Sequence, residues 1–240
     1  MAIKAGEDTF HQANRGVVQD GLVLNLDAAV TDSYNGGTQW RDLKGDNNST
    51  LENNPSFNRS NGGIISFDGT DDFIDIGDFD LTQVSTAITV SVWYKAPSTQ
   101  TGSYPLLIGN GGGWSAGGFL LMKYGSGFRW EIQGNGKQHL DYTYNFWNDT
   151  WQNVVSSWSG NSMKIYQGGA LVKSGTGITS ISSNGNTGHL RMGGKGSSNA
   201  PSIGTAYAEV DIGSVQIYSK QLTDTEVSKN FNVMRHRFGV

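Results

Sequence analysis

Short runs of alternating apolar and polar residues recur along most of the chain, and they constrain its fold more than any other feature. In the clearest run, residues 87–95, Ile88, Val90, Val92 and Tyr94 share one face. Because successive side chains of a strand point to opposite faces, this alternation indicates a strand with one buried face. Similar runs, separated by Gly- and Asn-containing turns, predict about thirteen short strands.

The predicted strands and the one predicted helix define a single β domain. Strands are expected at 22–27, 62–69, 72–77, 87–95, 105–109, 118–124, 127–133, 138–144, 151–160, 163–169, 189–194 and 210–218, with shorter pieces around Trp40 and Phe57. Thr223 and Glu226 form a capping box, and Val227, Phe231 and Met234 follow with helical spacing, which predicts a helix at about 224–235. Many short strands with one terminal helix favour a β-sandwich or jelly roll.

Composition excludes several classes of protein. Gly accounts for 34 of 240 residues, the net charge is −4, and there is no Cys. No basic stripe is present that would neutralise a nucleic acid, so we expect no nucleic-acid partner. The absence of Cys excludes disulfides, zinc–thiolate sites and Cys nucleophiles. No apolar run approaches the roughly 18 residues that span a bilayer, so we expect no membrane insertion.

Residues 1–20 are polar and lack strand or helix periodicity. They are interpreted as an arm before a domain that spans residues 21–240. The arm is either a frayed terminus or a segment that orders on a partner. It has no apolar core of a Sec signal peptide, so we expect the chain to be made in a cytoplasm.

Seven segments occur in an order that resembles a known family. They are GLVLNLDA (21–28), WRDLKGDNN (40–48), GGIISFDGTDDFIDIG (62–77), ITVSVWYK (88–95), WQNVVSSW (151–158), MKIYQGG (163–169) and VQIYSKQLTDTEV (215–227). Together they resemble a laminin-G-like domain of the concanavalin A-like lectin/glucanase superfamily. The resemblance covers roughly residues 21–238 and implies an all-β, two-sheet jelly-roll sandwich with one C-terminal helix.

The two ends of the sequence add a second resemblance. Residues 5–28 and 230–240 are similar to marine bacteriophage, cyanophage-like virion proteins that carry such a domain. This similarity implies a head decoration, spike, tail or fibre component located in the virion. Its implied partners are other capsid, neck or tail proteins, further copies of the chain in a homo-oligomer, and a host surface glycan.

The resemblance raises the alternative of an enzyme, because the superfamily includes glycoside hydrolases, which need two carboxylates flanking the scissile bond. The glucanase signature Glu-x-Asp-x-x-Glu is incomplete at Glu209-Val-Asp211, because Ser214 replaces the second Glu. Glu131 could pair with an Asp as the second carboxylate of a glycosidase, but no feature of the sequence identifies one. None of the four His residues lies near a G-x-S-x-G nucleophile motif, so no catalytic residue is assigned.

A structural Ca²⁺ site is the metal hypothesis, although no cofactor is required. The resemblance implies that Asp68, in the FDG motif, and Asp211, on the final strand, are its ligands. The alternative for Asp68 is a turn role, in which its carboxylate accepts backbone N–H groups before Gly69. Asp71 and Asp72 are interpreted as solvated loop charges.

Aromatic residues in loop-like stretches are the candidates for glycan binding, because a sugar's apolar face stacks on a ring. Each has an alternative role in the core or as a lid over it. The candidates are Trp114, Tyr104, Trp147, Tyr207 and Trp93.

Residues near the two ends are the candidates for assembly contacts, with a solvated tail as the alternative at the C-terminus. They are Phe10, His11, Arg15, Arg235, Arg237 and Phe238. The resemblance thus favours a non-enzymatic virion structural protein whose domain serves assembly contact, particle decoration or adhesion to host glycans. The alternatives are a free carbohydrate-binding module and a glycoside hydrolase of the same superfamily.

Overall fold

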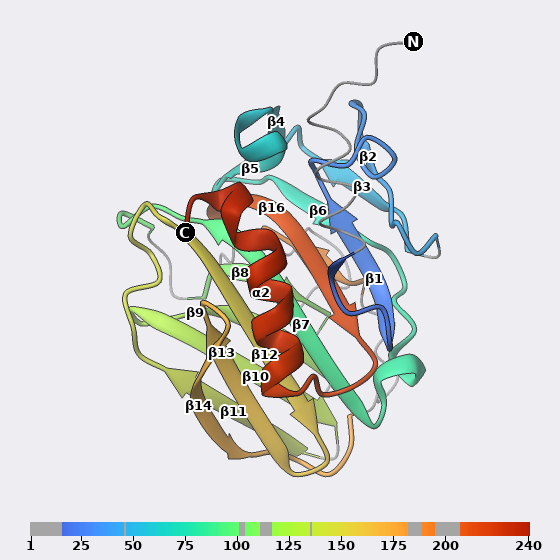
Figure 1. Cartoon of the computed structure of the whole chain (residues 1–240), viewed down its shortest axis with the longest axis vertical. Helices are drawn as coiled ribbons and strands as arrows, with labels where there is room; N and C mark the ends of the chain where they lie inside the picture. Colours follow the sequence, from blue (N-terminus) through green and yellow to red (C-terminus); the bar gives the residue numbers. More distant parts are fainter. Residues whose placement is uncertain are drawn as a thin grey trace.

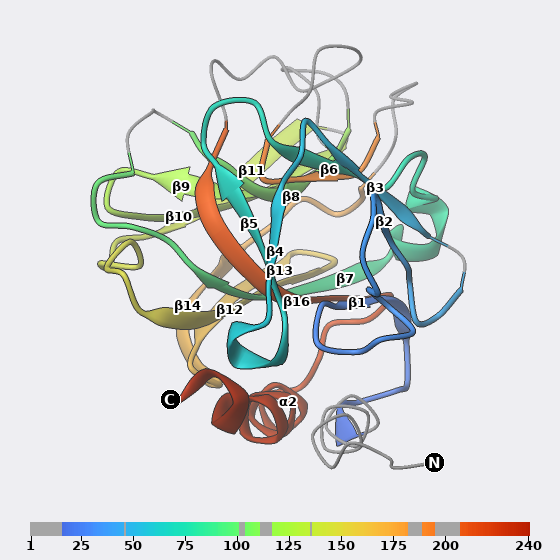
Figure 2. The same ribbon diagram turned by 90° about the horizontal axis from the view of Figure 1, so that it is seen from above.

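The computed structural model describes residues 16–45, 47–100, 104–110, 117–134, 136–181, 189–194 and 207–240. Two antiparallel sheets face each other, and one helix lies outside them (Figures 1 and 2). This arrangement confirms the expected all-β two-sheet sandwich with one C-terminal helix.

Sheet A contains the long central strands. Its order is β14 (Ala170–Thr176), β13 (Ser162–Gln167), β12 (Trp151–Ser159), β7 (Ala87–Lys95), β16 (Glu209–Tyr218), β5 (Ile64–Asp68) and β4 (Ser56–Asn58), and β1 (Leu22–Asp27) also pairs with β16. Sheet B has the order β11 (Gly136–Tyr142), β10 (Gly127–Gly134), β9 (Gly118–Tyr124), β8 (Leu106–Gly109), β15 (Arg191–Met192), β6 (Phe73–Asp75), β3 (Ser49–Glu52) and β2 (Gln39–Trp40). Two short 3₁₀ helices span Ser60–Gly62 and Leu81–Val84.

The main core lies between the two sheets. The apolar faces of β7, β10 and β12 point into it, so that Val92, Trp130 and Trp158 are fully buried. This is the face that strand alternation assigns to the interior. Trp130 and Trp158 also find acceptors for their indole N–H groups, in the carbonyls of Ser157 (3.1 Å) and Ile178 (2.8 Å).

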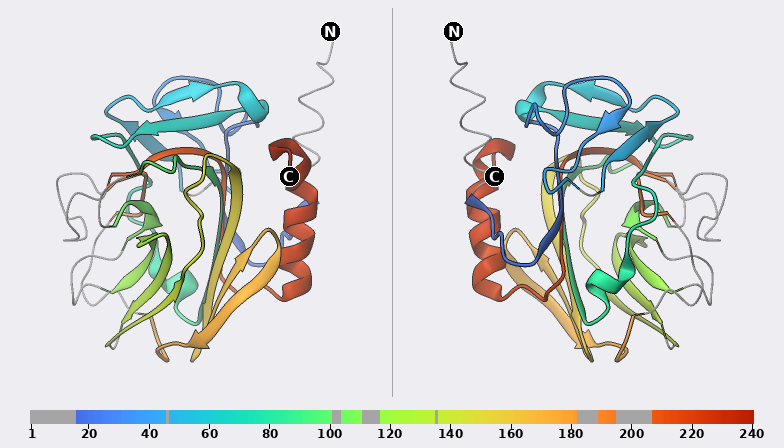
Figure 3. Two further views of the ribbon diagram at one scale, coloured as in Figure 1. Left: turned by 90° about the vertical axis from the view of Figure 1, so that its left-hand side faces the viewer. Right: turned by 90° about the vertical axis from the view of Figure 1, so that its right-hand side faces the viewer.

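Helix α2 (Asp224–Phe238) covers the outer face of sheet A (Figure 3). The predicted capping box is present, with Thr223 and Glu226 exchanging side-chain-to-backbone hydrogen bonds. The helix ends at Gly239, whose positive φ of 72° is accessible to Gly at little energetic cost. The helix therefore extends three residues beyond the predicted end at about residue 235.

The segment before β1 is attached to the domain in its described part. Val17 and Val18 are buried, and the Val18 N–H donates to the Asn230 side chain of α2 (2.8 Å). Asp20 pairs with Lys220 (2.6 Å). Val17, Val18 and Asp20, which lie before the predicted domain start at residue 21, thus contact α2 or the loop before it.

Among the described residues, no helix combines the length and apolar character needed to cross a membrane.

Candidate functional site

Two of the five aromatic glycan candidates are buried, which corrects their assignment. Trp93 lies on the outer face of sheet A, as its strand alternation predicts, but α2 covers it and leaves it 1% exposed. Its ring stacks on Phe238 (centroids 4.4 Å apart) and Phe231 (5.5 Å). Trp147 is part of the main core and packs on Phe128. Neither ring is available to a sugar.

Two of the other three candidates lie within the described residues. Trp114 lies outside the described residues. Tyr207 is half-buried beside Gly194, where a Cβ would come within 2.2 Å of its ring. Tyr104 is half-buried two residues before β8 and stacks on Tyr124, with ring centroids 5.9 Å apart. Through its contact with Tyr124, Tyr104 is part of a partly exposed aromatic surface.

The β9–β10 hairpin builds that surface on the outer face of sheet B. Its turn includes Gly125, whose φ of 58° suits glycine. The register pairs Gly127 with Tyr124, and Arg129 with Met122 on β9 and with Asp141 on β11. Because paired residues share a face, Tyr124, Arg129 and Asp141 all project away from the core.

Arg129 connects the aromatic and acidic parts of this surface. Its guanidinium carbon lies 3.8 Å from the centre of the Tyr124 ring, and two of its nitrogens donate to the two Asp141 carboxylate oxygens at 2.8 Å each. The hydrogen bonds to Asp141 raise the pKa of Arg129. Tyr104, Tyr124, Arg129 and Asp141 are called the tyrosine–arginine platform below. It places Tyr124, a residue that is 39% exposed, beside an oriented polar pair.

A second polar group lies on the same face, further along β10 and β11. Glu131 is fully buried and pairs with Lys137 (3.0 Å), and the Gln133 side-chain amide donates to it. Within the part of the chain that the structure describes, the second Glu131 carboxylate oxygen and the Gln133 amide oxygen are buried without a hydrogen-bond partner. His139, opposite Glu131, is exposed.

This face holds carboxylates, but they are arranged unlike the acid pair of a glycosidase. Asp141 is clamped by Arg129 and Glu131 is paired with Lys137, whereas a glycosidase keeps one carboxyl group protonated as the general acid. The strand reads Glu131-Ile-Gln133, so the glucanase signature is also incomplete here. At the other candidate, Asp211 accepts from Ser66 and pairs with Lys95 (3.0 Å).

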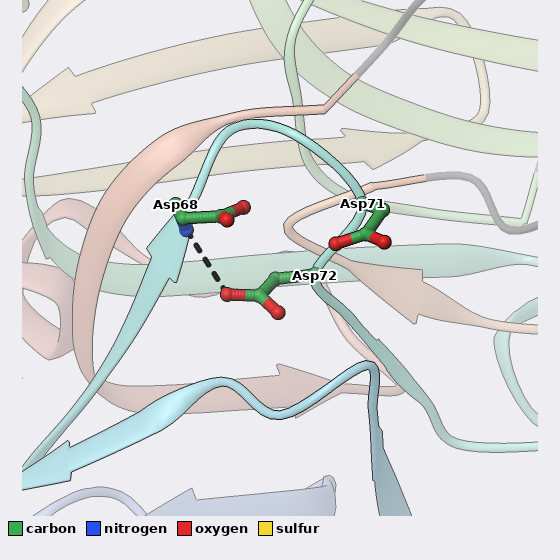
Figure 4. A group of neighbouring side chains, drawn as sticks. All are labelled: Asp68, Asp71 and Asp72. Atoms are coloured by element: carbon green, nitrogen blue, oxygen red, sulfur yellow. Dashed lines mark hydrogen bonds between the residues drawn. The ribbon is translucent and has the colours of Figure 1, made fainter.

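Of the two calcium candidates, Asp68 lies in a group with Asp71 and Asp72 (Figure 4), and Asp211 is not a member of that group. Carboxylate oxygens of Asp68, Asp71 and Asp72 lie within 4.8 Å of one another. Asp72 is buried rather than solvated, and burial is the main cause that raises its pKa. Asp211 is engaged instead with Ser66 and Lys95.

Hydrogen bonds within this loop show what the carboxylates do there. Asp68 accepts from the Thr70 N–H (2.8 Å), and Asp72 accepts from the Asp68 N–H (3.1 Å). With one oxygen from each, the three carboxylates supply three of the six to eight oxygens that Ca²⁺ takes, and Asp68 and Asp72 each already use one oxygen to accept a backbone N–H. The geometry fits the turn role of Asp68 and does not by itself fit calcium.

Two of the C-terminal assembly candidates are internal, which corrects their assignment. Arg237 is buried against Asp27 and three backbone carbonyls, and Phe238 is 4% exposed beneath the helix. Arg235 is half-buried and donates to the Val240 carbonyl (3.4 Å). The remaining candidates, Phe10, His11 and Arg15, lie outside the described residues.

Sequence reasoning missed three of the four platform residues, although a signal existed. In GFLLMKY (118–124) and GFRWEIQG (127–134), Phe119, Leu121 and Trp130 mark the core face, so Tyr124 and Arg129 fall on the opposite one. Their pairing with Asp141 depends on the β10–β11 register, which alternation alone does not give.

Comparisons with known proteins agree with this architecture. Residues 68–228 match the family model described as "Concanavalin A-like lectin/glucanases superfamily". No curated protein matches the sequence.

Solved structures share the fold at low sequence identity. The binding domain of Paraclostridial Mosquitocidal Protein 1 has a TM-score of 0.70 and 14% identity, over 88% of this chain and 52% of that one. The receptor-binding domain of botulinum neurotoxin C/D mosaic serotype has a TM-score of 0.68 and 16% identity, over 90% and 52%. The binding domain of botulinum neurotoxin DC in complex with SialylT has a TM-score of 0.66 and 14% identity, over 90% of this chain and 52% of that one. The chain thus spans about half the length of these structures.

Proposed function

We propose that this chain, which belongs to the concanavalin A-like lectin/glucanases superfamily, is a non-enzymatic binding domain that holds a carbohydrate on the outer face of sheet B. The tyrosine–arginine platform is the observation that carries the proposal. The part of the Tyr124 side chain that Tyr104 and Arg129 leave exposed can contact the apolar face of a sugar, and the Asp141 carboxylate beside it can accept hydrogen bonds from sugar hydroxyls.

Preorganisation of the platform supports a binding role. Tyr104 lies against Tyr124, Arg129 lies over the same ring, and Asp141 fixes the guanidinium from two points. Side chains already held in place lose little rotamer freedom when a ligand arrives. The similar solved structures are titled as binding or receptor-binding domains, which also supports binding over catalysis.

The test is glycan binding by the purified chain and by platform variants. Glycan arrays would identify a ligand, and titration calorimetry would measure its affinity. We expect Tyr124→Ala to lower the affinity about tenfold, equivalent to ~1.4 kcal/mol. Arg129→Lys should also weaken binding, because Lys keeps the charge but loses the planar two-point contact.

Leu171→Ala is the matched control. Leu171 is 43% exposed on β14, the edge strand of sheet A, so its truncation should leave affinity unchanged. Equal affinity for the wild type and Tyr124→Ala, with both folded by circular dichroism, would contradict this site. Release of reducing ends from a bound polysaccharide, lost in Glu131→Gln, would instead support the glycosidase alternative.

We further propose that the domain is displayed on a bacteriophage particle, as a head decoration, spike, tail or fibre component. The similarity of residues 5–28 and 230–240 to cyanophage-like virion proteins supports this setting. Mass spectrometry of purified particles should then detect the chain, and cryo-electron microscopy should locate it against a capsid or tail neighbour. Its absence from particles would favour a free carbohydrate-binding module.

A further inference from the structure

The cations on the outer face of sheet B are matched by carboxylates. On β10 and β11, Arg129 binds Asp141 at two points (2.8 Å each), and Lys137 pairs with Glu131 (3.0 Å). These pairs are formed within the protein, so their charges compensate each other before any ligand is present.

The same compensation extends across the sheet to β15 and β6. Arg191 is opposite Asp75 in the register and bonds to it at 3.3 Å. The pairing that links β10 through β9 and β8 to β15 puts this pair on the same face as Glu131. The Asp75 carboxylate also contacts the imidazole of His189 at 2.8 Å.

Two buried oxygens on this face require hydrogen-bond donors. The second Glu131 carboxylate oxygen and the Gln133 amide oxygen have no hydrogen-bond partner among the described residues. The Gln133 amide oxygen and an ionised Glu131 carboxylate oxygen can only accept hydrogen bonds. A group that meets them must therefore donate an O–H or N–H, which an ionised carboxylate or sulfate of a ligand does not do. The two oxygens and the paired charges therefore both favour a neutral ligand that donates hydrogen bonds.

We infer that the ligand of this face is a neutral, hydroxyl-rich saccharide, and that sulfated, sialylated or uronic-acid glycans are disfavoured. This inference rests on the proposed carbohydrate-binding function and names its ligand class. A neutral sugar can contact the exposed part of Tyr124 and donate hydrogen bonds from its hydroxyls to Asp141 while Asp141 stays bound to Arg129. An acidic glycan has to compete with Asp141 for Arg129, or with Glu131 for Lys137.

A single substitution should change the ligand class. Asp141→Asn keeps the shape of the side chain but removes the charge that neutralises Arg129. We expect this variant to gain binding to dextran sulfate, with a Kd at least tenfold lower than that of the wild type and weakening as salt is added.

Asp224→Asn is the matched control, because it removes one negative charge, as Asp141→Asn does, at a place outside sheet B. Asp224 pairs with Lys164 (3.2 Å) at the start of α2, outside sheet A. If the site on sheet B is responsible, this variant should not gain binding to dextran sulfate. An equal gain in both variants would show an effect of net charge alone and would overturn the inference.

The closing experiment is an array of neutral oligosaccharides and their sulfated and sialylated counterparts, probed with the wild type and both variants. Wild-type binding to neutral members only, with a gain of acidic members in Asp141→Asn, is the expected result. Preferential wild-type binding to acidic members overturns the ligand class while leaving carbohydrate binding intact. Wild-type binding to no member overturns the proposed function itself, and the ligand class with it.

Discussion

The Arg237 guanidinium and the Asp27 carboxylate, separated by 210 residues in the chain, lie 2.6 Å apart in a site where both side chains are at most 4% exposed. Arg237 also donates to the carbonyls of Asn61, Gly63 and Gly213. One side chain therefore ties the last turn of α2 to β1, to β16 and to the loop before β5. Such a buried pair gives the helix one defined position against the sheet.

Removing Arg237 should destabilise the whole domain. Arg237→Ala leaves the Asp27 charge buried without its cation, and breaking such pairs typically lowers the free energy of unfolding by about 3–5 kcal/mol. Urea unfolding followed by Trp fluorescence measures the change. Lys229→Ala, on the exposed side of the same helix, should change stability by less than ~0.5 kcal/mol. A loss below ~1 kcal/mol for Arg237→Ala would contradict the anchoring role.

Trp93 should be the main apolar attachment point of α2. Its ring lies nearly parallel to the rings of Phe231 and Phe238, with interplanar angles of 8° and 12°. Trp93→Ala would leave a cavity beneath the helix and lower the free energy of unfolding by about 3–5 kcal/mol. Trp93→Phe should have a smaller effect. Hydrogen exchange would show whether the α2 amides lose protection first; unchanged protection in Trp93→Ala would argue against this attachment.

The capping box should make a measurable but smaller contribution. Thr223→Ala removes the side chain that accepts from the Glu226 N–H, and such changes lower stability by about 1 kcal/mol. Thr225→Ala is the control, because Thr225 is exposed in the first turn of the helix and its replacement should be neutral or slightly stabilising. Thermal unfolding distinguishes the two variants, and equal melting temperatures would count against the cap.

Acid should weaken the start of α2. Hydrogen bonds from Tyr166 and Lys164 lower the pKa of Asp224, and a hydrogen bond from Lys220 is the main cause that lowers the pKa of Glu226. A carboxyl group whose pKa is lowered by folding stabilises the fold at pH values above its ordinary pKa, which is near 4. That contribution is lost as the pH falls through the pKa that the group has in the folded state.

The double variant Asp224→Asn/Glu226→Gln isolates this effect. Its melting temperature should fall less steeply than that of the wild type between pH 6 and pH 2.5. Asp72 acts in the opposite sense, because burial raises its pKa, so protonation of Asp72 favours the folded state. Parallel curves for the two proteins would contradict a role for the helix carboxylates.

Strand alternation and the capping box were sufficient to predict most elements and the fold class, but two strands were missed for identifiable reasons. β14 is an edge strand whose residues are mostly exposed, so it has no apolar face to reveal it. β3 is four residues long and lies in an Asn- and Gly-rich stretch that indicates a loop.

The candidate site was harder to predict, because it depends on contacts between strands. Alternation correctly put Trp93 on the outer face of its strand, but it does not reveal that α2 covers that face. Tyr104 was identified as a loop aromatic, whereas its stacking on Tyr124 depends on the path of the chain before β8. Sequence patterns predict on which face of a strand a side chain lies, but tertiary packing decides whether that face is exposed to solvent.

The two ends of the described chain lie on the side of the sandwich opposite the tyrosine–arginine platform. Gly16 lies beside Val233 of α2, and Val240 follows the same helix, outside sheet A. A tether or affinity tag joined at Val240 would therefore attach the molecule on the sheet A side and leave sheet B facing outward. In a dense array of copies immobilised this way, many platforms would point toward one surface, so even weak individual contacts would add up to avid adhesion.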